Sequence, residues 1–382
     1  MYLSMIQQRS RLLASGLSIS LLVAAGVGCS NSTTTNNSNG SSGVSCTPPP
    51  SSLPSFSVPQ GPPAITGGFG YAVKTSSHKV VWYKVESSGV LTSRGEICAG
   101  FQPTFIAANS TRKLAYVTNF SSDTVSAYTI GTDGALAALG SPVPAGNGPA
   151  SINVDWTRNL VYVTNFESDS ISVYEIDSSN GTLTRVQDLQ TGLGPDAIAG
   201  DSTGKFVYVA SFKSDTLSVY RVNEATRRLD TTPIATYNVR LRGENGPNAL
   251  TITGSFLYVT SEESDTVSAY SIKTTGELES LGGPLSTGNG PEGVTVDTTG
   301  KFAYVADGQA DTISIYTIGA NGVLQAPRVS ISTLPARDPE GIMMDSVTNT
   351  IFVVNRETND VSAYKISNAT TGALSLVGHF GL

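Results

Sequence analysis

The chain has 382 residues and a formal net charge of −7, with 30 acidic and 23 basic side chains. This negative balance argues against nucleic acid as a partner, because phosphate backbones are bound by clustered Lys and Arg. The 39 glycines, the charged fraction of 14% and the lack of a long helical periodicity favour an all-β protein of many short strands.

The first 28 residues have the pattern of an export signal. Arg9 and Arg11 precede an apolar run over residues 12–27, and Cys29 follows Gly28. At about 16 residues the run is shorter than the ~20 that a membrane-spanning helix needs. A cysteine after small residues resembles the bacterial lipobox, in which the thiol is acylated. We therefore expect a signal peptide over residues 1–28, lipidation at Cys29 and a protein held at the cell envelope by lipid alone, in the outer membrane; an ordinary secretory signal is the alternative.

A polar segment follows the signal. Residues 29–52 consist mainly of Ser, Thr, Asn, Gly and Pro, which bury too little apolar surface to offset chain entropy, so a disordered tether is predicted. The three cysteines are at positions 29, 46 and 98. If Cys29 is acylated, Cys46 and Cys98 remain as an even pair in an oxidising compartment, where a disulfide is expected. Two unpaired thiols are the alternative.

The rest of the chain is a repeat. The sequence YVTNFSSDTVSAY begins at Tyr116 and returns with changes, each copy holding two strand-like runs joined by a polar turn. The spacing of 45 to 50 residues marks a repeat architecture. The copies begin at Tyr71, Tyr116, Tyr162, Tyr208, Tyr258, Tyr304 and Phe352.

The third unit shows the plan of each repeat. Strands are predicted over residues 149–155, 159–166, 171–176 and 182–189, with turn residues between them. Seven such units predict a seven-bladed β-propeller of four-stranded antiparallel blades, forming one domain over residues 53–382. A closed ring is expected because an open array would leave two hydrophobic blade faces in water. The first unit lacks a clear inner strand. We expect part of residues 53–66 to supply this strand or, alternatively, to pair with the last blade and close the ring.

Residues that recur in most units are expected to be structural. The repeated tyrosines should pack between blades, and the turn aspartates such as Asp123 should accept hydrogen bonds from nearby backbone N–H groups. His78 takes the turn position of its own unit and is expected at the surface.

Positions that differ between units point to a site at the channel mouth. The residue after the proline that opens each inner strand changes from small to acidic along the chain, and the end of the second strand adds further polar groups. We expect a small-ligand site there, with carboxylates close enough to raise a pKa or to recruit a divalent cation; a solvated polar rim is the alternative. The candidate catalytic residues are Glu292 and Glu340, and the candidate ligand-binding residues are Asp196, Asn248, Asp307, Asn355 and Arg356.

The motif YVTN stands unchanged at Tyr116 and Tyr162, and the repeats around it resemble the YVTN-type β-propellers. More broadly, residues 64 to 380 are similar to the lactonase-fold family, which includes 6-phosphogluconolactonase-like and muconate-cycloisomerase-like propellers. The resemblance implies a propeller with polar side chains at the channel mouth and, in the enzymes, action on sugar or carboxylate lactones. Those enzymes are expected to use histidine at the mouth, but no inner strand opens with histidine here, so no catalytic residue is carried over.

Two functions follow from these observations. The first is a non-enzymatic, lipid-anchored monomer that binds a small ligand, glycan or protein at the propeller face. The alternative is a lactone hydrolase or isomerase in which Glu292 or Glu340 is the general base, with or without a divalent cation.

Overall fold

The computed structural model describes Cys46 and residues 60–239 and 246–382. The expected signal peptide over residues 1–28, the lipidation site Cys29 and the expected tether, apart from Cys46, lie outside the described residues. The described residues form strands almost throughout, with two one-turn 3₁₀ helices, η1 (Thr75–Ser77) and η2 (Phe120–Ser122). None of the helices in this described part is long and apolar enough to span a membrane.

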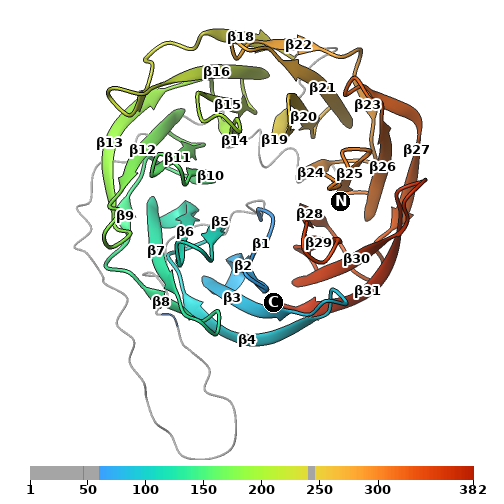
Figure 1. The fold of residues 1–382 in the computed structure, drawn as a ribbon, viewed down its shortest axis with the longest axis horizontal. Helices are drawn as coiled ribbons and strands as arrows, with labels where there is room; N and C mark the ends of the chain where they lie inside the picture. Colours follow the sequence, from blue (N-terminus) through green and yellow to red (C-terminus); the bar gives the residue numbers. More distant parts are fainter. Residues whose placement is uncertain (1–45, 47–59, 240–245) are drawn as a thin grey trace, which may run out of the picture. The chain divides into compact units, whose positions relative to one another are not determined.

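The strands form seven antiparallel sheets, and each sheet is built from a continuous stretch of chain (Figure 1). The fold is therefore the predicted seven-bladed β-propeller, with blades numbered here in chain order. Blades 1 to 3 are β1 (Ala64–Thr66), β2 (Phe69–Lys74), β3 (Lys79–Val85) and β4 (Leu91–Cys98); β5 (Pro103–Asn109), β6 (Leu114–Asn119), β7 (Thr124–Ile130), β8 (Leu136–Ala138) and β9 (Val143–Pro144); and β10 (Pro149–Asp155), β11 (Leu160–Asn165), β12 (Ser170–Ile176) and β13 (Leu183–Gln190).

Blades 4 to 7 repeat this order. They are β14 (Pro195–Gly200), β15 (Phe206–Ser211), β16 (Thr216–Asn223), β17 (Arg228–Leu229) and β18 (Ala235–Asn238); β19 (Pro247–Thr253), β20 (Phe256–Ser261), β21 (Thr266–Ile272), β22 (Leu278–Ser280) and β23 (Leu285–Ser286); β24 (Pro291–Val296), β25 (Phe302–Asp307), β26 (Thr312–Ile318) and β27 (Leu324–Ser332); and β28 (Pro339–Asp345), β29 (Thr350–Asn355), β30 (Asp360–Asn368) and β31 (Ala373–Gly381). In blades 2, 4 and 5 the outer strand is divided into two short strands, both paired with the third strand.

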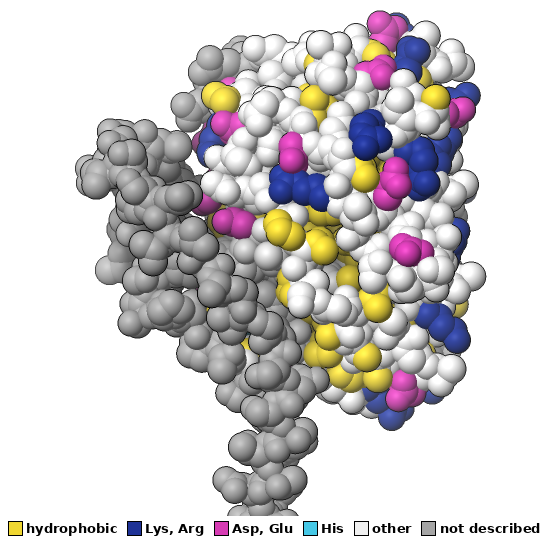
Figure 2. Space-filling model, turned by 90° about the vertical axis from the view of Figure 1, so that its left-hand side faces the viewer, with side chains coloured by type: hydrophobic (Ala, Val, Ile, Leu, Met, Phe, Trp, Pro, Cys, Tyr) yellow, Lys and Arg dark blue, Asp and Glu magenta, His cyan; other side chains and the backbone are white. Residues whose placement is uncertain are grey.

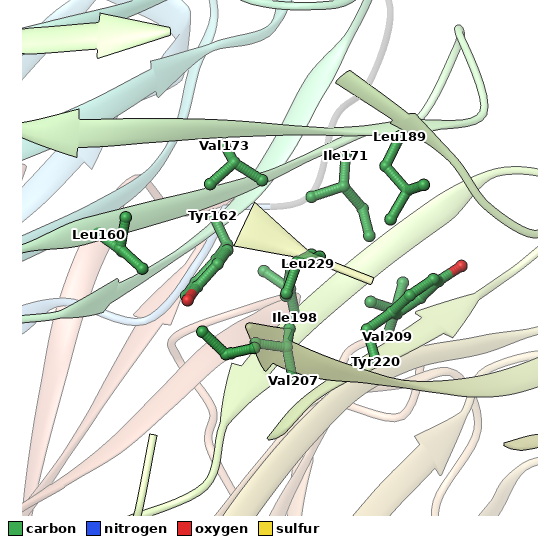
Figure 3. Packing of buried hydrophobic residues seen from close by; sticks show 11 residues of the cluster. Leu160, Tyr162, Ile171, Val173, Leu189, Ile198, Val207, Val209, Tyr220 and Leu229 are labelled. Carbon is green, nitrogen blue, oxygen red and sulfur yellow. The ribbon is translucent and has the colours of Figure 1, made fainter. Parts of the chain in front are cut away.

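The core lies between neighbouring blades. Figure 3 shows one such cluster, in which Tyr162 and Val173 of blade 3 pack with Val207 and Tyr220 of blade 4. A similar cluster joins blade 7 to blade 1 and includes Phe352 and Tyr83. Burial of these aliphatic and aromatic side chains is the main force that holds blade to blade.

The recurring tyrosines add polar contacts to these interfaces. In five blades the tyrosine of the second strand donates its hydroxyl to a glycine carbonyl in the outer hairpin of the next blade, at 2.8–3.0 Å. These residues are Tyr71, Tyr116, Tyr208, Tyr258 and Tyr304. Burial raises the pKa of Tyr71 and Tyr258 to about 12, so their hydroxyls stay protonated and structural.

The turn aspartates also join blades, rather than only closing their own turns. Asp123 Oδ1 accepts a hydrogen bond from Gly148 N at 2.8 Å, in the loop that opens blade 3. Asp169, Asp215, Asp265 and Asp311 make the same contact to the next blade at 2.7–3.0 Å. All five have positive φ between 52° and 55°. The acceptor role was predicted, but the N–H groups belong to the next blade and not to the local turn.

His78 makes the equivalent contact between blades 1 and 2. Its φ is 60°, and its Nδ1 accepts a hydrogen bond from Gln102 N at 3.2 Å, which requires the neutral ring. The imidazole is half-buried beside Phe101, with ring centroids 5.3 Å apart. Burial lowers the pKa of His78 from its usual 6.5, and the Thr75 carbonyl offsets part of this effect. His78 is therefore an interface residue, contrary to the surface position expected from sequence.

A pH-dependent stability is expected from His78. Because its folded-state pKa lies below the unfolded value of 6.5, the unfolded chain binds the proton first, and stability is lost as pH falls through 6.5 towards the folded pKa. The variant His78→Asn keeps an acceptor and suits positive φ, as Asn359 does in blade 7 at φ 55°. Thermal unfolding at about pH 7.5 and about pH 5.5 should show a smaller loss in the variant than in the parent. Equal losses in both proteins would contradict this role.

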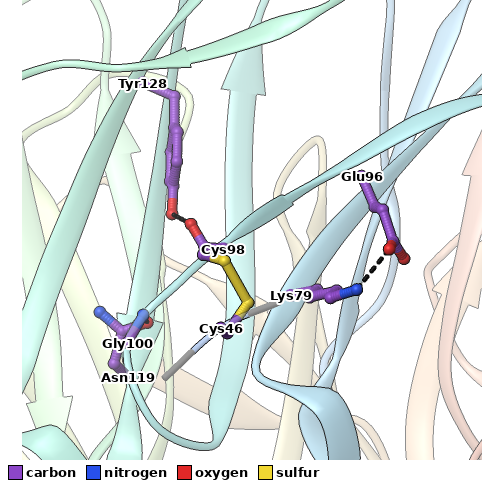
Figure 4. Close-up of a disulfide and its surroundings, with 7 residues drawn as sticks. All are labelled: Cys46, Lys79, Glu96, Cys98, Gly100, Asn119 and Tyr128. Carbon is purple, nitrogen blue, oxygen red and sulfur yellow. Dashed lines mark hydrogen bonds and ion pairs between the residues drawn. A yellow bond between two sulfur atoms is a disulfide. The ribbon is translucent and has the colours of Figure 1, made fainter. Parts of the chain in front are cut away.

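The expected disulfide is present. Cys46 is bonded to Cys98 at the end of β4, with Cα atoms 5.7 Å apart (Figure 4). The carbonyl of Cys98 accepts a hydrogen bond from the hydroxyl of Tyr128 at 2.9 Å, so the same residue ties blade 1 to blade 2.

The side of the ring that carries β9, β12 and β13 shows Lys and Arg interspersed with Asp and Glu, and a band of hydrophobic side chains (Figure 2). The part of the surface seen there has no large area of one charge sign.

Candidate functional site

The predicted arc of the channel mouth is built on β-bulges. In blade 4, Pro195 pairs with Ser211 and Ala197 pairs with Ala210, so Asp196 is the extra residue. The same irregularity follows the opening proline of blades 2, 3, 5, 6 and 7. A bulge frees one residue from the ladder and redirects its side chain. The residues at this position are Thr104, Ala150, Asp196, Asn248, Glu292 and Glu340.

Blade 1 completes this ring through residues that precede β1. Ala64 pairs with Tyr71 as Ala107 pairs with Tyr116 in blade 2. Counting back four residues from each alanine places Gln60 at the position of the opening Pro103. The inner strand of blade 1 is therefore supplied from residues 53–66, as predicted, and it pairs with its own blade and not with blade 7. Of the seven opening residues only Gln60 has a backbone N–H, because the other six are prolines.

Glu340 uses that N–H. Gln60 N donates to Glu340 Oε2 at 2.5 Å, while Gly61 N donates to Thr104 O at 2.7 Å. The short segment thus bridges blade 7 and blade 2. Glu340 is only 1% exposed, and its Oε1 lies 2.9 Å from Arg356 Nη1. The structure therefore places this predicted catalytic residue in a buried contact that closes the ring.

Glu292 lies in the neighbouring blade and is half-buried. Asn248 Nδ2 donates to Glu292 Oε2 at 3.1 Å and to Pro291 O at 2.7 Å. The amide of blade 5 therefore orients the carboxylate of blade 6. Asp196 lies one blade before Asn248 and is also half-buried. Glu292 therefore combines partial exposure with an orientation that Asn248 fixes.

Arg356 connects the two glutamates electrostatically. Its Nε donates to Asp338 Oδ2 at 2.8 Å, its Nη1 faces Glu340, and the side chain is 32% exposed. Burial by itself lowers the pKa of Arg356, but Glu340 first, then Asp338 and Glu292, raise it above its usual value. The guanidinium therefore stays charged beside the arc. Asp338, which sequence reasoning did not select, is the residue that positions it.

The two remaining candidates are inside their blades. Asp307 is 0% exposed, and its Oδ2 accepts the hydroxyls of Ser314 at 2.6 Å and Thr312 at 2.9 Å. Asn355 is 0% exposed and donates to Ser362 Oγ at 2.7 Å. Both side chains hold the third strand of their own blade, as Asn119 and Asn165 do.

The divalent cation expected at the mouth would need several converging ligands. Within Cys46, 60–239 and 246–382, no three His, Cys, Asp or Glu side chains converge closely enough to hold a metal ion. The positive group beside Glu340 is Arg356. A divalent cation at the channel mouth stays a prediction from the sequence, and the residues described here offer it no cluster of three such ligands.

A separate cavity of about 250 Å³ lies between blades 2 and 3. Its lining includes Arg112, Trp156 and Asp177, which belong to the hairpins at the end of the blades opposite the opening prolines. It is distinct from the channel mouth, and none of the predicted site residues lines it.

Comparison with known proteins gives the family. The family described as "Lactonase, 7-bladed beta-propeller" matches residues 66–380. The chain belongs to this lactonase family. Membership in this family supports the second function expected from the sequence, lactone chemistry, better than the first, a non-enzymatic scaffold. If the chain is an enzyme, the family supports a lactonase.

Solved propellers share the fold of this lactonase-family chain. A protein from Lactobacillus plantarum is 23% identical with a TM-score of 0.71, covering 82% of this chain and 95% of that one. A candidate 6-phosphogluconolactonase from Bacteroides fragilis is 18% identical with a TM-score of 0.69, covering 78% and 89%. The periplasmic gluconolactonase PpgL of Pseudomonas aeruginosa is 18% identical with a TM-score of 0.64, covering 73% and 86%. Among curated proteins no sequence matches.

Proposed function

We propose that the protein is a lactone hydrolase whose site is the mouth formed by blades 5, 6 and 7. The observation that carries the proposal is the position of an oriented, half-buried carboxylate, Glu292, on the same rim as the charged guanidinium of Arg356. A Cβ on Gly308 would lie within 3.2 Å of both Glu292 Cγ and Asp338 Oδ1, and Asp338 binds Arg356. A base and a positive group on one rim are what ester hydrolysis needs, since a proton must leave water and negative charge develops on the carbonyl oxygen. Family membership supports the same reaction class.

In the proposed mechanism Glu292 removes a proton from water, and the hydroxide oxygen bonds to the lactone carbonyl carbon. The oxyanion of the tetrahedral intermediate is stabilised by the charge of Arg356. The carbonyl then re-forms, the ring C–O bond breaks, and the proton held by Glu292 passes to the departing ring oxygen, which gives a hydroxy acid. Asn248 orients Glu292, and Asp338 and Glu340 position Arg356.

The test is Glu292→Gln, which removes the base and keeps the size of the side chain. Lactone hydrolysis by the purified protein should fall by about 10²–10⁴ in kcat, the usual contribution of a general base. Glu279→Gln on blade 5, where Glu279 is 64% exposed and pairs with Lys273, is the matched control and should keep full activity. A parent protein that hydrolyses no lactone, or activity that survives Glu292→Gln, would reject this site.

We also propose that the mature protein is exported and anchored through lipid on Cys29. The short apolar run, the position of Cys29 and the Cys46–Cys98 disulfide support an oxidising compartment. In cells, Cys29→Ala should release the protein from the membrane fraction, and mass spectrometry of the parent should find an acylated N-terminus. Unchanged membrane retention in the variant would contradict the anchor.

A further inference from the structure

The cavity between blades 2 and 3 lies where the repeat has a smaller side chain than in four other units. The first residue of the second strand packs over a glycine in the outer hairpin of the next blade, and a Cβ added to that glycine would lie 2.2–2.5 Å from it. In four blades this residue is phenylalanine, at Phe69, Phe206, Phe256 and Phe302. In blade 2 it is Leu114, which reaches Gly181 but has no ring, and the space of about 250 Å³ adjoins it.

Trp156 lines the cavity at a position where the other units have small residues. It is half-buried and begins the turn that joins Asp155 to Leu160, between the first and second strands of blade 3. Its indole packs on Tyr116, with ring centroids 5.8 Å apart and an interplanar angle of 24°. Tyr116 is 0% exposed and does not line the cavity, so Trp156 is the aromatic side chain that the cavity presents. The corresponding residues in the other units are Gly67, Ser110, Ser202, Gly254, Thr298 and Ser346.

Hydrogen-bonding groups line the same cavity. Arg112 Nη2 donates to the carbonyl of Trp156 at 2.8 Å, which holds the guanidinium beside the tryptophan. Asp177, in the outer hairpin of blade 3, is exposed, and its Oδ1 accepts hydrogen bonds from Ser179 N at 2.8 Å and Ser179 Oγ at 2.6 Å. Asn180 is also exposed and lines the cavity. The cavity therefore opens to solvent and combines one flat ring with a donor and an acceptor that the fold holds in place.

This combination of groups suits a neutral sugar. The C–H face of a pyranose is apolar and stacks on an aromatic ring, because its C–H groups meet the negative face of the π system. The hydroxyls of the sugar both donate and accept, so they match a guanidinium and a carboxylate around one ring. Charges of both signs line the cavity, Arg112 and Lys113 against Asp177, so neither an anion nor a cation meets charge of one sign. The volume lies just below the about 300–1,000 Å³ of drug-sized ligands, which leaves room for one small ring.

We propose that the cavity between blades 2 and 3 is a carbohydrate-binding site, which holds one ring of a neutral glycan against Trp156. Arg112 donates to hydroxyls of that ring, and Asp177 accepts from them. The site lies at the end of the blades opposite the opening prolines, away from Glu292 and Arg356. It therefore does not rest on the lactonase function, and a failure of either proposal leaves the other standing.

The experiment uses the fluorescence of Trp156, one of the two tryptophans of the chain. In the full-length variant Trp82→Phe, Trp156 is the remaining tryptophan, and its emission is followed during titration with maltose, cellobiose and lactose. At least one disaccharide should give a saturable change with a Kd of about 1 mM or lower, the range of a small ligand held through one ring. Glucose 6-phosphate, the charged probe, should bind more weakly than the best disaccharide.

Two further variants locate the binding, with titration calorimetry of the best disaccharide as the measurement. Trp156→Ser introduces the residue that three other units have at this position. Leu114→Phe fills the cavity with the ring that four other units have there. Each should weaken binding by about tenfold or more, because the first removes the stacking surface and the second removes the space. Trp82→Phe, in blade 1, is the control and should keep the affinity of the parent.

A parent that binds none of the three disaccharides would overturn the site. Binding that keeps its affinity in both Trp156→Ser and Leu114→Phe would lie elsewhere on the protein and would overturn it as well. Tighter binding of glucose 6-phosphate than of every disaccharide would overturn the neutral class of ligand. If Trp156→Ser does not fold, Leu114→Phe decides alone, since the propeller already accommodates phenylalanine at this position in four blades.

Discussion

Replacing Gly341 with alanine should destabilise the propeller by about 3 kcal/mol, the upper range for forcing extra volume into a packed site. A Cβ at Gly341 would lie 2.4 Å from both Gly61 C and Pro62 N and 2.5 Å from Gly61 O. All three are backbone atoms, which cannot turn away as a flexible side chain could. The segment must therefore shift, and the contacts of Gln60 N with Glu340 and of Gly61 N with Thr104 would be lost.

This effect is expected because, among the described residues, the interface between blades 7 and 1 lacks two contacts that recur around the ring. Blade 7 has Phe352 where five blades have a hydroxyl-donating tyrosine, and Asn359 where five have a bridging aspartate. Tyr83, which donates to Gly381 O at 2.6 Å, keeps one of the shared contacts. The bridge from Gln60 and Gly61 compensates for the missing ones.

The measurement is thermal unfolding of Gly341→Ala against the parent. Gly283→Ala is the matched control, because no atom lies within 4 Å of its added Cβ and its φ is not positive. Gly283→Ala should unfold close to the parent. If both variants unfold at the same temperature, the segment from Gln60 to Pro62 does not hold the ring closed.

The repeat predicted the blades well because packing imposes the same alternation on each unit. The third unit shows this, since the predicted strands at 149–155 and 171–176 become Pro149–Asp155 and Ser170–Ile176. The divided outer strands of blades 2, 4 and 5 were not predicted. In each of these blades a proline, which cannot donate to the ladder, lies between the two short strands: Pro142, Pro233 and Pro284. The repeated motif does not include these prolines.

The site was predicted less completely, for a reason that lies at the strand ends. Side chains alternate across a strand, so when Asn355 points into its blade the next residue, Arg356, points the other way. Sequence reasoning compared the seven residues at the strand end, which include the buried Asp307, instead of the seven that follow. That second set contains Arg356, the one member that was predicted as a site residue.

Contacts of Gln60 could not be predicted by any alignment of the repeats. The importance of its N–H appears only when the ring closes and brings Gln60 beside Glu340, 280 positions away in the chain. The same holds for Asp338, whose carboxylate positions Arg356 through the loop that opens blade 7. Long-range partners of this kind depend on the folded ring and leave no local pattern.

Removing Arg356 should show whether Glu340 is structural. Arg356→Ala takes the guanidinium from a carboxylate that is 1% exposed, and breaking a buried ion pair costs about 3 kcal/mol or more. Because the Arg356 side chain is 32% exposed, solvent screening reduces the expected loss to about 2 kcal/mol. Lys84→Ala removes an exposed pair with Glu86 at 3.9 Å and should cost within about 1 kcal/mol.

The double variant Glu340→Gln/Arg356→Ala separates the explanations. Glutamine keeps an oxygen that can accept the N–H of Gln60 and carries no charge, so the double variant should be more stable than Arg356→Ala alone. A double variant that is no more stable than Arg356→Ala would mean that the loss comes from the packing of the arginine stem and not from a stranded charge. Lactone turnover should be measured on the same variants. Glu340→Gln with Arg356 retained should keep most activity, because Glu340 closes the ring and touches no reacting atom. Arg356→Ala should lose activity even in the double variant, where stability is restored.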